Sequence, residues 1–568
     1  MTISKTNTKV AKQANHLSPI NLINTPVMSR CLLSVAVASA LLLAGCGDDN
    51  DTPNTSINAP QSIATFTPIQ IDQELLEAST IGKAITPAAK CGVTVEKIGY
   101  QTKGAANEPT NATAALMIPS GNTAECQGDR PILLYAHETT TEQKFDFTQV
   151  GNAQNPAEIE ATMIAANFAA QGYIVVAPNY AGYDSSDLNY HPYLNAKQQS
   201  TEMVTALDTA RAAINQQRNA NNATYTKVND SGKLFLSGYS QGGHVTMATA
   251  RLLEQQNKPI TAIAPSSGPY ALAAFGDAIF TGNVSIGSTA FAPLLATSLQ
   301  KANNKIYNNP TEIFAGNYAN TKLPNALSFE DLVLAGKLPL TALFQAKPTN
   351  SPVLDGLPAS SLPFASVGFD SSNYLIQTDF RAAYVIDALQ NPDDLLAQNG
   401  RAFPALNPQN ELRKTLKVND LRGYVPKIPT LLCGGNQDPS VFYDLNTSSM
   451  AKILQGANAQ NPAAQINVTV LDVDGSNKDR TTLTLIGKAS MNAWNVQTVL
   501  DNVQAKFAGT VGQEYAAAYQ NVINNGGTAQ QAEQGAGAAI LRTYHGTHVS
   551  TACTQATREF FDQEFKKS

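Results

Sequence analysis

Charged residues are scarce in this sequence: Asp, Glu, Lys and Arg make up 14% of the 568 residues, whereas hydrophobic residues make up 43%. The surface of the folded protein must therefore rely on Asn, Gln, Ser and Thr, and there is enough apolar material for a sizeable core. The formal net charge of −6 provides no basic footprint for nucleic acid. We therefore expect a globular protein without a nucleic-acid partner.

Long apolar runs are also scarce. After residue 46 no run is long enough to span a bilayer, and no internal repeat is visible. Before it, the run from Cys31 to Ala44 is too short to span a membrane comfortably, but its length is typical of a signal-peptide core, and Arg30 precedes it. The N-terminus therefore predicts export.

The end of this apolar run, Leu43-Ala44-Gly45-Cys46, resembles a bacterial lipobox. The resemblance implies cleavage before Cys46 and lipidation of Cys46, which would anchor the protein to a membrane of the cell envelope, with the outer membrane as the expected one. An ordinary secretory signal, and hence a secreted protein, is the alternative. Residues 1–46 are then the signal peptide, with Met28 as an alternative start, and the polar, proline-punctuated residues 47–68 are a flexible tether.

Cysteine is rare as well. Of six cysteines, four remain once the signal and Cys46 are set aside, namely Cys91, Cys126, Cys433 and Cys553. An even number in an oxidising compartment predicts two disulfides, for which three pairings are open. We favour Cys91 with Cys126, because they bracket an expected hairpin, and Cys433 with Cys553 for a reason given below.

Strand signals recur from residue 93 onward, each a run rich in β-formers and bounded by Gly, Pro or Asn. The expected strands are 93–102, 112–118, 131–136, 173–177, 234–237, 260–264, 429–433 and 466–473. The first two are expected to form an antiparallel pair. The later ones are short and almost wholly apolar, as strands buried on both faces must be.

Amphipathic helices are expected between these strands, at 157–170, 197–217, 243–254, 448–456 and 550–565. The alternation implies an α/β protein with a mostly parallel eight-stranded sheet and helices on both faces. We divide the core into 69–265 and 428–475. A cap or lid insertion is expected at 266–427, a smaller helical insertion at 476–540, and a final loop and helix at 541–568.

The pentapeptide Gly238-Tyr239-Ser240-Gln241-Gly242 lies between an expected strand and an expected helix. That context is typical of a nucleophile elbow, a sharp turn that needs small residues two positions before and after the serine. The turn would expose the hydroxyl of Ser240 and aim the N–H of Gln241 at a developing oxyanion. Ser240 is therefore the predicted nucleophile, although a chance Gly-x-Ser-x-Gly is common in a glycine-rich chain.

Eight strands with the nucleophile after the fifth is the order of the α/β-hydrolases, in which the acid and then the histidine follow along the chain. Asp438 lies on a glycine-rich turn directly after the seventh expected strand, at the edge of the sheet where ligands bind. We predict that Asp438 is the acid. Its alternative role is a helix N-cap, and Asp444 and Asp472 are weaker candidates.

Two histidines follow Asp438, and they are His545 and His548. A Gly-x-His directly before the last helix is the expected setting, so we predict that His548 is the base, with His545 as the alternative. A zinc site is disfavoured because no third ligand has suitable spacing. Cys433 lies five residues before Asp438 and Cys553 five after His548, so a disulfide between them would join the acid loop to the histidine loop.

Several segments resemble the secretory-lipase-like branch of the α/β-hydrolases. The matching features are the loop from Tyr135 to Thr139, the segment 179–194, the elbow, the segment 426–438 and the turn at His548. The resemblance implies that Thr139 supplies the second oxyanion N–H beside Gln241. One residue departs from the family pattern, because Glu138 stands where members carry glycine.

Together these features predict a serine carboxylic ester hydrolase, an esterase or lipase, exported as a bacterial lipoprotein and acting on a small-molecule or lipid ester. No metal or organic cofactor is implied. A serine peptidase and an acyltransferase would use the same triad, and a non-catalytic surface binding protein is a further alternative.

Overall fold

The computed structural model describes residues 59–358, 367–397, 401–403, 407–491 and 494–566. The predicted signal peptide, its lipobox and Cys46 lie outside the described residues, so lipidation stays a prediction. No helix in the described ranges has both the length and the apolar character needed to cross a membrane.

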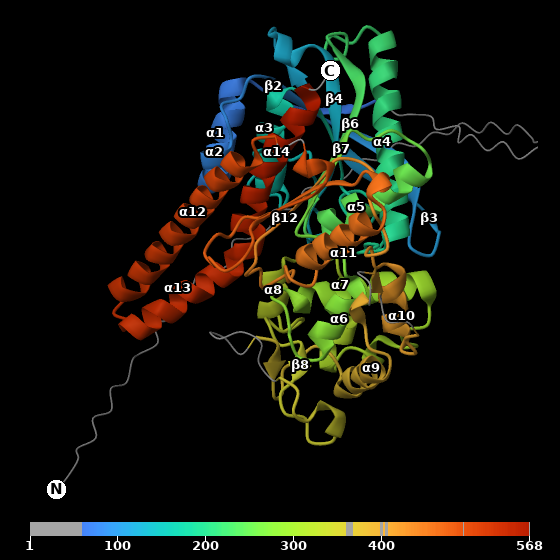
Figure 1. The fold of residues 1–568 in the computed structure, drawn as a ribbon, viewed down its shortest axis with the longest axis vertical. Helices are drawn as coiled ribbons and strands as arrows, with labels where there is room; N and C mark the ends of the chain where they lie inside the picture. Colours follow the sequence, from blue (N-terminus) through green and yellow to red (C-terminus); the bar gives the residue numbers. More distant parts are fainter. Residues whose placement is uncertain (1–58, 359–366, 398–400, 404–406, 492–493, 567–568) are drawn as a thin grey trace, which may run out of the picture. The chain divides into compact units, whose positions relative to one another are not determined.

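A ten-stranded mixed sheet forms the centre of the fold, in the order β1-β2-β3-β5-β4-β6-β7-β12-β13-β14 (Figure 1). The strands are β1 Gln61–Phe66, β2 Gly92–Lys103, β3 Pro109–Ser120, β4 Gly128–Ala136, β5 Ile174–Pro178, β6 Val228–Tyr239, β7 Ala262–Ser266, β12 Thr430–Gly434, β13 Asn467–Asp472 and β14 Leu483–Gly487. The six strands from β5 to β13 in this order pair in parallel, and β2 pairs with β3 antiparallel as expected.

Two strands correct the eight-stranded prediction. Strand β1 falls inside the segment predicted to be a tether, where it pairs antiparallel with β2. Strand β14 falls inside the predicted helical insertion and pairs antiparallel with β13. Both are edge strands that stay partly exposed, so their sequences lack the continuous apolar pattern that marked the inner strands.

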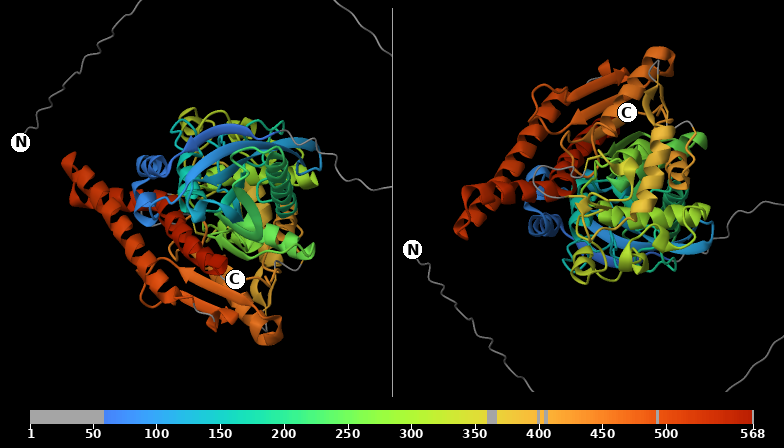
Figure 2. Two further views of the ribbon diagram at one scale, coloured as in Figure 1. Left: turned by 90° about the horizontal axis from the view of Figure 1, so that it is seen from above. Right: turned by 90° about the horizontal axis from the view of Figure 1, so that it is seen from below.

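Helices cover both faces of the sheet (Figure 2). These helices fall into two groups by their mutual contacts. In one group α3 contacts α1 and α14, and in the other α4 contacts α5. The helices of the core are α1 Pro68–Ala78, α2 Thr80–Ile85, α3 Glu158–Asn167, α4 Ala196–Asn219, α5 Gln241–Gln255, α11 Thr447–Gln460 and α14 Ser550–Lys566. Local signals start several of them; for example, the side chain of Asn195 caps α4 by accepting from the N–H of Gln198.

Between β7 and β12 the chain forms a largely helical insertion around a second apolar cluster. Its elements are α6 Leu272–Phe280, α7 Ser288–Asn303, α8 Phe329–Leu334, α9 Thr378–Gln390, α10 Glu411–Val418, and the short strands β8 Phe344–Gln345, β9 Phe369–Asp370, β10 Asp394–Ala397 and β11 Arg401–Phe403. The predicted insertion at 266–427 covers these elements, but its boundaries and its role as a lid stay predictions.

A long helical hairpin precedes the last helix. Helices α12 (Val496–Asn524) and α13 (Ala529–Thr543) lie side by side in all three ribbon views (Figures 1 and 2). The end of α13 leads directly into a π-helical turn, Tyr544–Val549, which is followed by α14. The root of the hairpin is therefore continuous with the segment that carries both candidate histidines.

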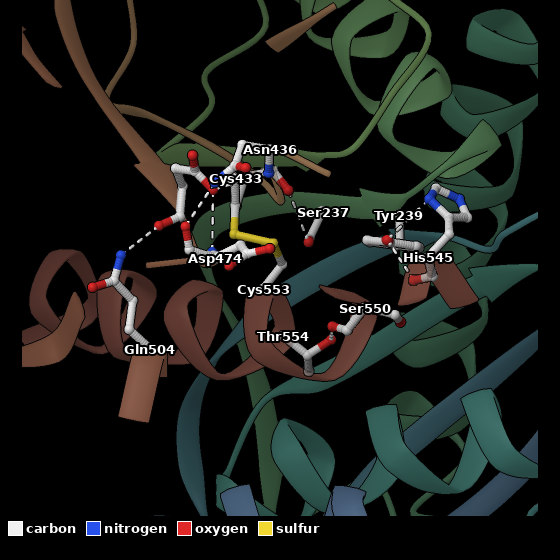
Figure 3. Close-up of a disulfide and its surroundings, with 12 residues drawn as sticks. Ser237, Tyr239, Cys433, Asn436, Asp474, Gln504, His545, Ser550, Cys553 and Thr554 are labelled. Atoms are coloured by element: carbon white, nitrogen blue, oxygen red, sulfur yellow. Dashed lines mark hydrogen bonds between the residues drawn. A yellow bond between two sulfur atoms is a disulfide. The ribbon is translucent and has the colours of Figure 1, made fainter. Parts of the chain in front are cut away.

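Both predicted disulfides are confirmed. Cys91 is bonded to Cys126 across 35 residues of sequence, and Cys433 is bonded to Cys553 across 120. The second disulfide joins the central strand β12 to the last helix α14, as Figure 3 shows.

Candidate active site

The predicted elbow has the strained backbone that such a turn requires. Ser240 lies between β6 and α5 with φ 55° and ψ −119°, a conformation that costs free energy for a residue other than glycine. A Cβ atom on Gly238 would lie 2.4 Å from the carbonyl oxygen of Gly242, and one on Gly242 would lie 1.9 Å from the carbonyl oxygen of Ala136. Both glycines are therefore sterically required, and the side chain of Ser240 is held at the end of β6.

The acid loop follows β12. One carboxylate oxygen of Asp438, Oδ1, accepts hydrogen bonds from the N–H groups of Ser440 (2.9 Å) and Val441 (3.0 Å). The other, Oδ2, lies 2.6 Å from Nδ1 of His545. The backbone bonds fix the carboxylate, and this leaves Oδ2 to orient one imidazole.

That imidazole belongs to His545, so the histidine that contacts Asp438 is not the predicted His548. The ring of His548 faces α12 instead, where its Nε2 donates to Oε2 of Glu514 (2.7 Å) and its Nδ1 lies 3.1 Å from Oγ1 of Thr510. The two histidines are three residues apart on a π-helical turn, and the turn directs their rings to different neighbours. The Gly-x-His pattern located the turn but not the direction of each ring.

The free nitrogen of His545 suits it to accept a proton. Its Nε2 is buried and has no hydrogen-bond partner among the residues that the structure describes. The residue before Ser240 holds the same histidine, because the hydroxyl of Tyr239 donates to the carbonyl oxygen of His545 at 2.7 Å (Figure 3). Sequence reasoning missed this contact, because nothing in the pentapeptide marks its second residue as a link to a histidine 306 positions later.

Two further links join the acid loop to the histidine turn. The hydroxyl of Tyr544 donates to Oδ2 of Asp474 (2.6 Å) and accepts from the N–H of Gln437 (3.2 Å). The Cys433–Cys553 disulfide adds a covalent link between the strand before the acid loop and the helix after the histidine turn. Both links restrict the relative movement of Asp438 and His545.

The predicted oxyanion residues come from two different elements. Gln241 is the first residue of α5, where backbone N–H groups have no intrahelical acceptor. Its side chain is 2.6 Å from Nε2 of His191, and burial lowers the pKa of His191 to about 3, so this ring is neutral and accepts the bond. Gln241 is thus oriented by a residue of the segment 179–194, to which the resemblance assigned no catalytic role.

The loop after β4 supplies the other predicted donor. The N–H of Glu138 is engaged, because it donates to Oε1 of Glu160 at 3.1 Å. The next residue, Thr139, exchanges a side-chain hydrogen bond with the hydroxyl of Tyr193 at 2.9 Å. This arrangement is compatible with Thr139 rather than Glu138 as the N–H donor, and the donor role stays a prediction.

An apolar cavity extends from Ser240 into the insertion, with an empty volume of about 760 Å³. Helices α6, α7 and α10 supply most of its lining, and the contributing side chains are mainly Leu, Ile and Phe. Among the lining residues Tyr193, Ser240, Gln241 and Ser288 carry polar side-chain atoms. The cavity is therefore suited to an alkyl chain whose polar end lies at Ser240.

In the described ranges, no group of three or more His, Cys, Asp or Glu side chains is placed to hold a metal ion. His545 and His548 face separate carboxylates, so the pair does not form the beginning of one site.

Comparisons with known proteins agree with this geometry. Residues 152–271, which include the elbow, match the model of a family described as secretory lipase. Among solved structures, a ligand-bound form of the rice cell wall degrading esterase LipA from Xanthomonas oryzae is 25% identical, with 74% of this chain and 92% of that chain covered and a TM-score of 0.55. Residues 152–271 are therefore similar to secretory lipases, and the chain has an α/β-hydrolase fold.

A putative hydrolase from Legionella pneumophila shares the fold at 20% identity, with 69% of this chain and 87% of that chain covered and a TM-score of 0.50. No curated protein sequence matches significantly. The family match and the LipA match support an esterase or lipase, and this agrees with the resemblance found in the sequence.

Proposed function

We propose that this protein is a serine carboxylic ester hydrolase that acts through an acyl-enzyme on Ser240, with His545 as the base and Asp438 as the acid. The observation that carries the proposal is the hydrogen bond between Asp438 and His545. The imidazole of His545 keeps its Nε2 free, and the backbone of His545 is bonded to Tyr239, the residue next to the strained Ser240.

In the first step, Oγ of Ser240 attacks the acyl carbon while Nε2 of His545 takes the hydroxyl proton. The carboxylate of Asp438 holds Nδ1–H and stabilises the imidazolium, and the N–H groups of Gln241 and Thr139 stabilise the tetrahedral oxyanion. His545 then gives its proton to the leaving alcohol. In the second step water repeats the sequence, so the acid departs and Ser240 regains its proton.

The apolar cavity supports an ester with an alkyl acyl chain over the peptidase alternative. A peptide substrate would bring backbone N–H and C=O groups that need partners, and the lining offers few. An acyltransferase would differ only in the acceptor of the second step, and no feature of the cavity favours it.

Export is part of the proposal. The family model is that of secretory lipases, and two disulfides suit an oxidising compartment. Lipidation at Cys46 and attachment to the outer membrane extend this proposal and depend on the sequence of residues 43–46.

The decisive experiment is labelling of the purified protein by a fluorophosphonate probe, compared among the parent, Ser240→Ala, His545→Gln and His548→Gln. We expect labelling to be lost in the first two variants and retained in His548→Gln, with melting temperatures measured for each to exclude misfolding. Labelling that survives in a folded His545→Gln protein but is lost in His548→Gln would return the base to His548. A parent that neither reacts nor hydrolyses p-nitrophenyl esters would leave a binding protein as the better account.

A further inference from the structure

A second cavity, distinct from the apolar one, lies where four segments meet: the end of α1 and start of α2, the loop after β4, helix α3, and the residues around the start of α14. Its empty volume is about 1150 Å³. Its lining is rich in hydroxyl and carboxyl groups, among them Glu138, Thr139, Glu160, Thr547, Ser550 and Thr551.

Several of these side chains are largely buried and have a polar atom without a partner in the described chain. Glu160 is 8% exposed, and Ser550 and Thr551 are each 5% exposed. Oε1 of Glu160 accepts from Tyr135 and from the N–H of Glu138, but its Oε2 has no hydrogen bond to any described residue. The side-chain hydroxyls of Ser550 and Thr551 likewise make none within the described chain, and neither oxygen is among its fully buried unpaired atoms, so both are open to the cavity that they line.

The position of this cavity suits it to the leaving group of the proposed reaction, which is the alcohol half of the ester. It is bordered by Thr139, the predicted oxyanion residue, and by Gly546, which follows the proposed base. The hydrogen bond between the hydroxyls of Thr139 and Tyr193 joins the wall of this cavity to that of the apolar cavity, which Tyr193 and Ser240 line. The histidine protonates the departing alcohol, so the alcohol half of an ester belongs on the histidine side of Ser240.

The charges of the lining limit the kind of alcohol that this cavity could bind. No positively charged side chain lines this cavity in the described part of the chain, whereas Glu77, Glu138 and Glu160 do. Burial, followed by the charge of Glu160, raises the pKa of Glu138 well above its ordinary value, and burial also raises the pKa of Glu160. Both carboxyl groups are therefore harder to ionise than free ones, and in the protonated form each can donate as well as accept a hydrogen bond.

We propose that this second cavity binds the alcohol half of the ester, and that this alcohol is uncharged and carries several hydroxyl groups, such as a sugar or another polyol. The inference rests on the proposed ester hydrolysis. Hydroxyls of the alcohol would pair with Glu160 Oε2, Ser550 and Thr551, and an anionic alcohol would be disfavoured because no positively charged side chain of the described lining could pair with it. Glu138, this chain's departure from the family pattern, would contribute to that selectivity.

The test uses three esters with the same acyl chain: ethyl octanoate, methyl 6-O-octanoyl-α-D-glucopyranoside, and 1-octanoyl-glycerol 3-phosphate. For the parent protein we expect kcat/KM for the glucoside ester to exceed that for ethyl octanoate by about tenfold or more, which corresponds to one or two well-made hydrogen bonds. We expect the anionic ester to be the slowest of the three.

The variant for this test is Thr551→Val, which removes a buried hydroxyl and keeps the shape. Its matched control is Thr557→Val on the same helix, where the residue is 2% exposed and does not line the cavity. We expect the ratio of kcat/KM for the glucoside ester to that for ethyl octanoate to fall about tenfold in Thr551→Val and to stay at the parent value in Thr557→Val. In addition, added methyl α-D-glucopyranoside should intercept the parent's acyl-enzyme more efficiently than 1-propanol does.

A parent that hydrolyses ethyl octanoate but shows no preference for the glucoside ester, and no preferential interception, would overturn the cavity assignment while leaving ester hydrolysis intact. The same conclusion would follow if Thr551→Val and Thr557→Val gave equal ratios. A parent without turnover of any of the three esters and without fluorophosphonate labelling would overturn ester hydrolysis, and the cavity assignment with it.

Discussion

Two histidine–carboxylate pairs lie three residues apart in this protein, and they differ in what their second nitrogen contacts. His545 donates to Asp438 and keeps Nε2 free, whereas His548 engages Glu514 with one nitrogen and contacts Thr510 with the other. The residue types are nearly the same. What separates a candidate base from a structural histidine is therefore the unoccupied nitrogen, together with the link through Tyr239 to the elbow.

The strongest test of the difference between His545 and His548 is to replace each histidine separately. We expect His545→Gln to lower kcat for p-nitrophenyl ester hydrolysis by about 10⁶, as Ser240→Ala should, because the serine loses its base. Stopped assays at high enzyme concentration would measure the residual rate. A residual rate in His545→Gln close to that of the parent would show that the pair with Asp438 is structural.

The partner carboxylate should matter less than the ring. We expect Asp438→Asn to lower kcat by about 10⁴, because an amide at this position favours the wrong tautomer of His545. Glu514→Gln provides the matched control at the other pair and should keep kcat within about tenfold of the parent. Equal losses in the two variants would remove the distinction between the pairs.

The two disulfides allow a second comparison, between a bond near the candidate triad and a bond away from it. Removing Cys433–Cys553 by Cys433→Ala with Cys553→Ala should lower both activity and melting temperature, because this bond joins the acid strand to the helix after the histidine turn. The Cys91→Ala, Cys126→Ala double variant should lower melting temperature alone. In the loop-entropy account, the loop across 120 residues contributes about 1 kcal/mol more than the loop across 35. Calorimetry and ester turnover on both variants would check this, and intact activity without Cys433–Cys553 would contradict it.

His548→Gln should act on stability more than on rate. Loss of the bond to Glu514 leaves a partly buried carboxylate without its donor, and we expect about 1 to 3 kcal/mol of destabilisation. Because α12 would then be less firmly held at the histidine turn, a modest fall in kcat of less than about tenfold should accompany it. Urea denaturation and steady-state kinetics on the same preparation would separate the two effects.

A buried histidine away from both pairs, His244, should have the smallest effect, and this effect concerns the pH dependence of stability. His244 bonds the carbonyl oxygen of Asn419 and has no carboxylate partner among the residues described, and burial lowers its pKa to about 4. Since its folded pKa lies below its unfolded value of about 6.5, its stabilising contribution is complete above pH 6.5 and is lost as the pH falls toward 4. We expect the melting temperature of His244→Gln to fall less steeply than that of the parent over this range. Parallel profiles would contradict this assignment.

The sequence predicted the inner part of the fold because the inner strands are continuously apolar and the elbow has sterically required glycines. All eight expected strands are present, and both disulfide pairings are confirmed. Strands β1 and β14 were missed because partly exposed edge strands lack an apolar run. The nucleophile and acid remain predictions that the geometry favours.

The histidine that contacts Asp438 was not the predicted one, and the physical reason is different. Which ring reaches Asp438 depends on a π-helical turn and on the position of α12, and neither is encoded in the local pattern around Gly546. Glu160 was also missed, because its role arises from contacts with Tyr135 and Glu138 on a separate segment of the chain. Both omissions concern side-chain direction rather than secondary structure.

The π-helical turn also makes the site sensitive to the length of the chain. Helix α13, the turn and α14 follow one another without a break from residue 529 to residue 566, so the wide turn sets the rotational register between the helices on its two sides. Each residue of an α-helix advances by about 100° around the axis. If one residue were deleted at Gly546 and the segment became regular α-helix, everything before the deletion would rotate by about that angle relative to α14, and the ring of His545 would no longer face Asp438.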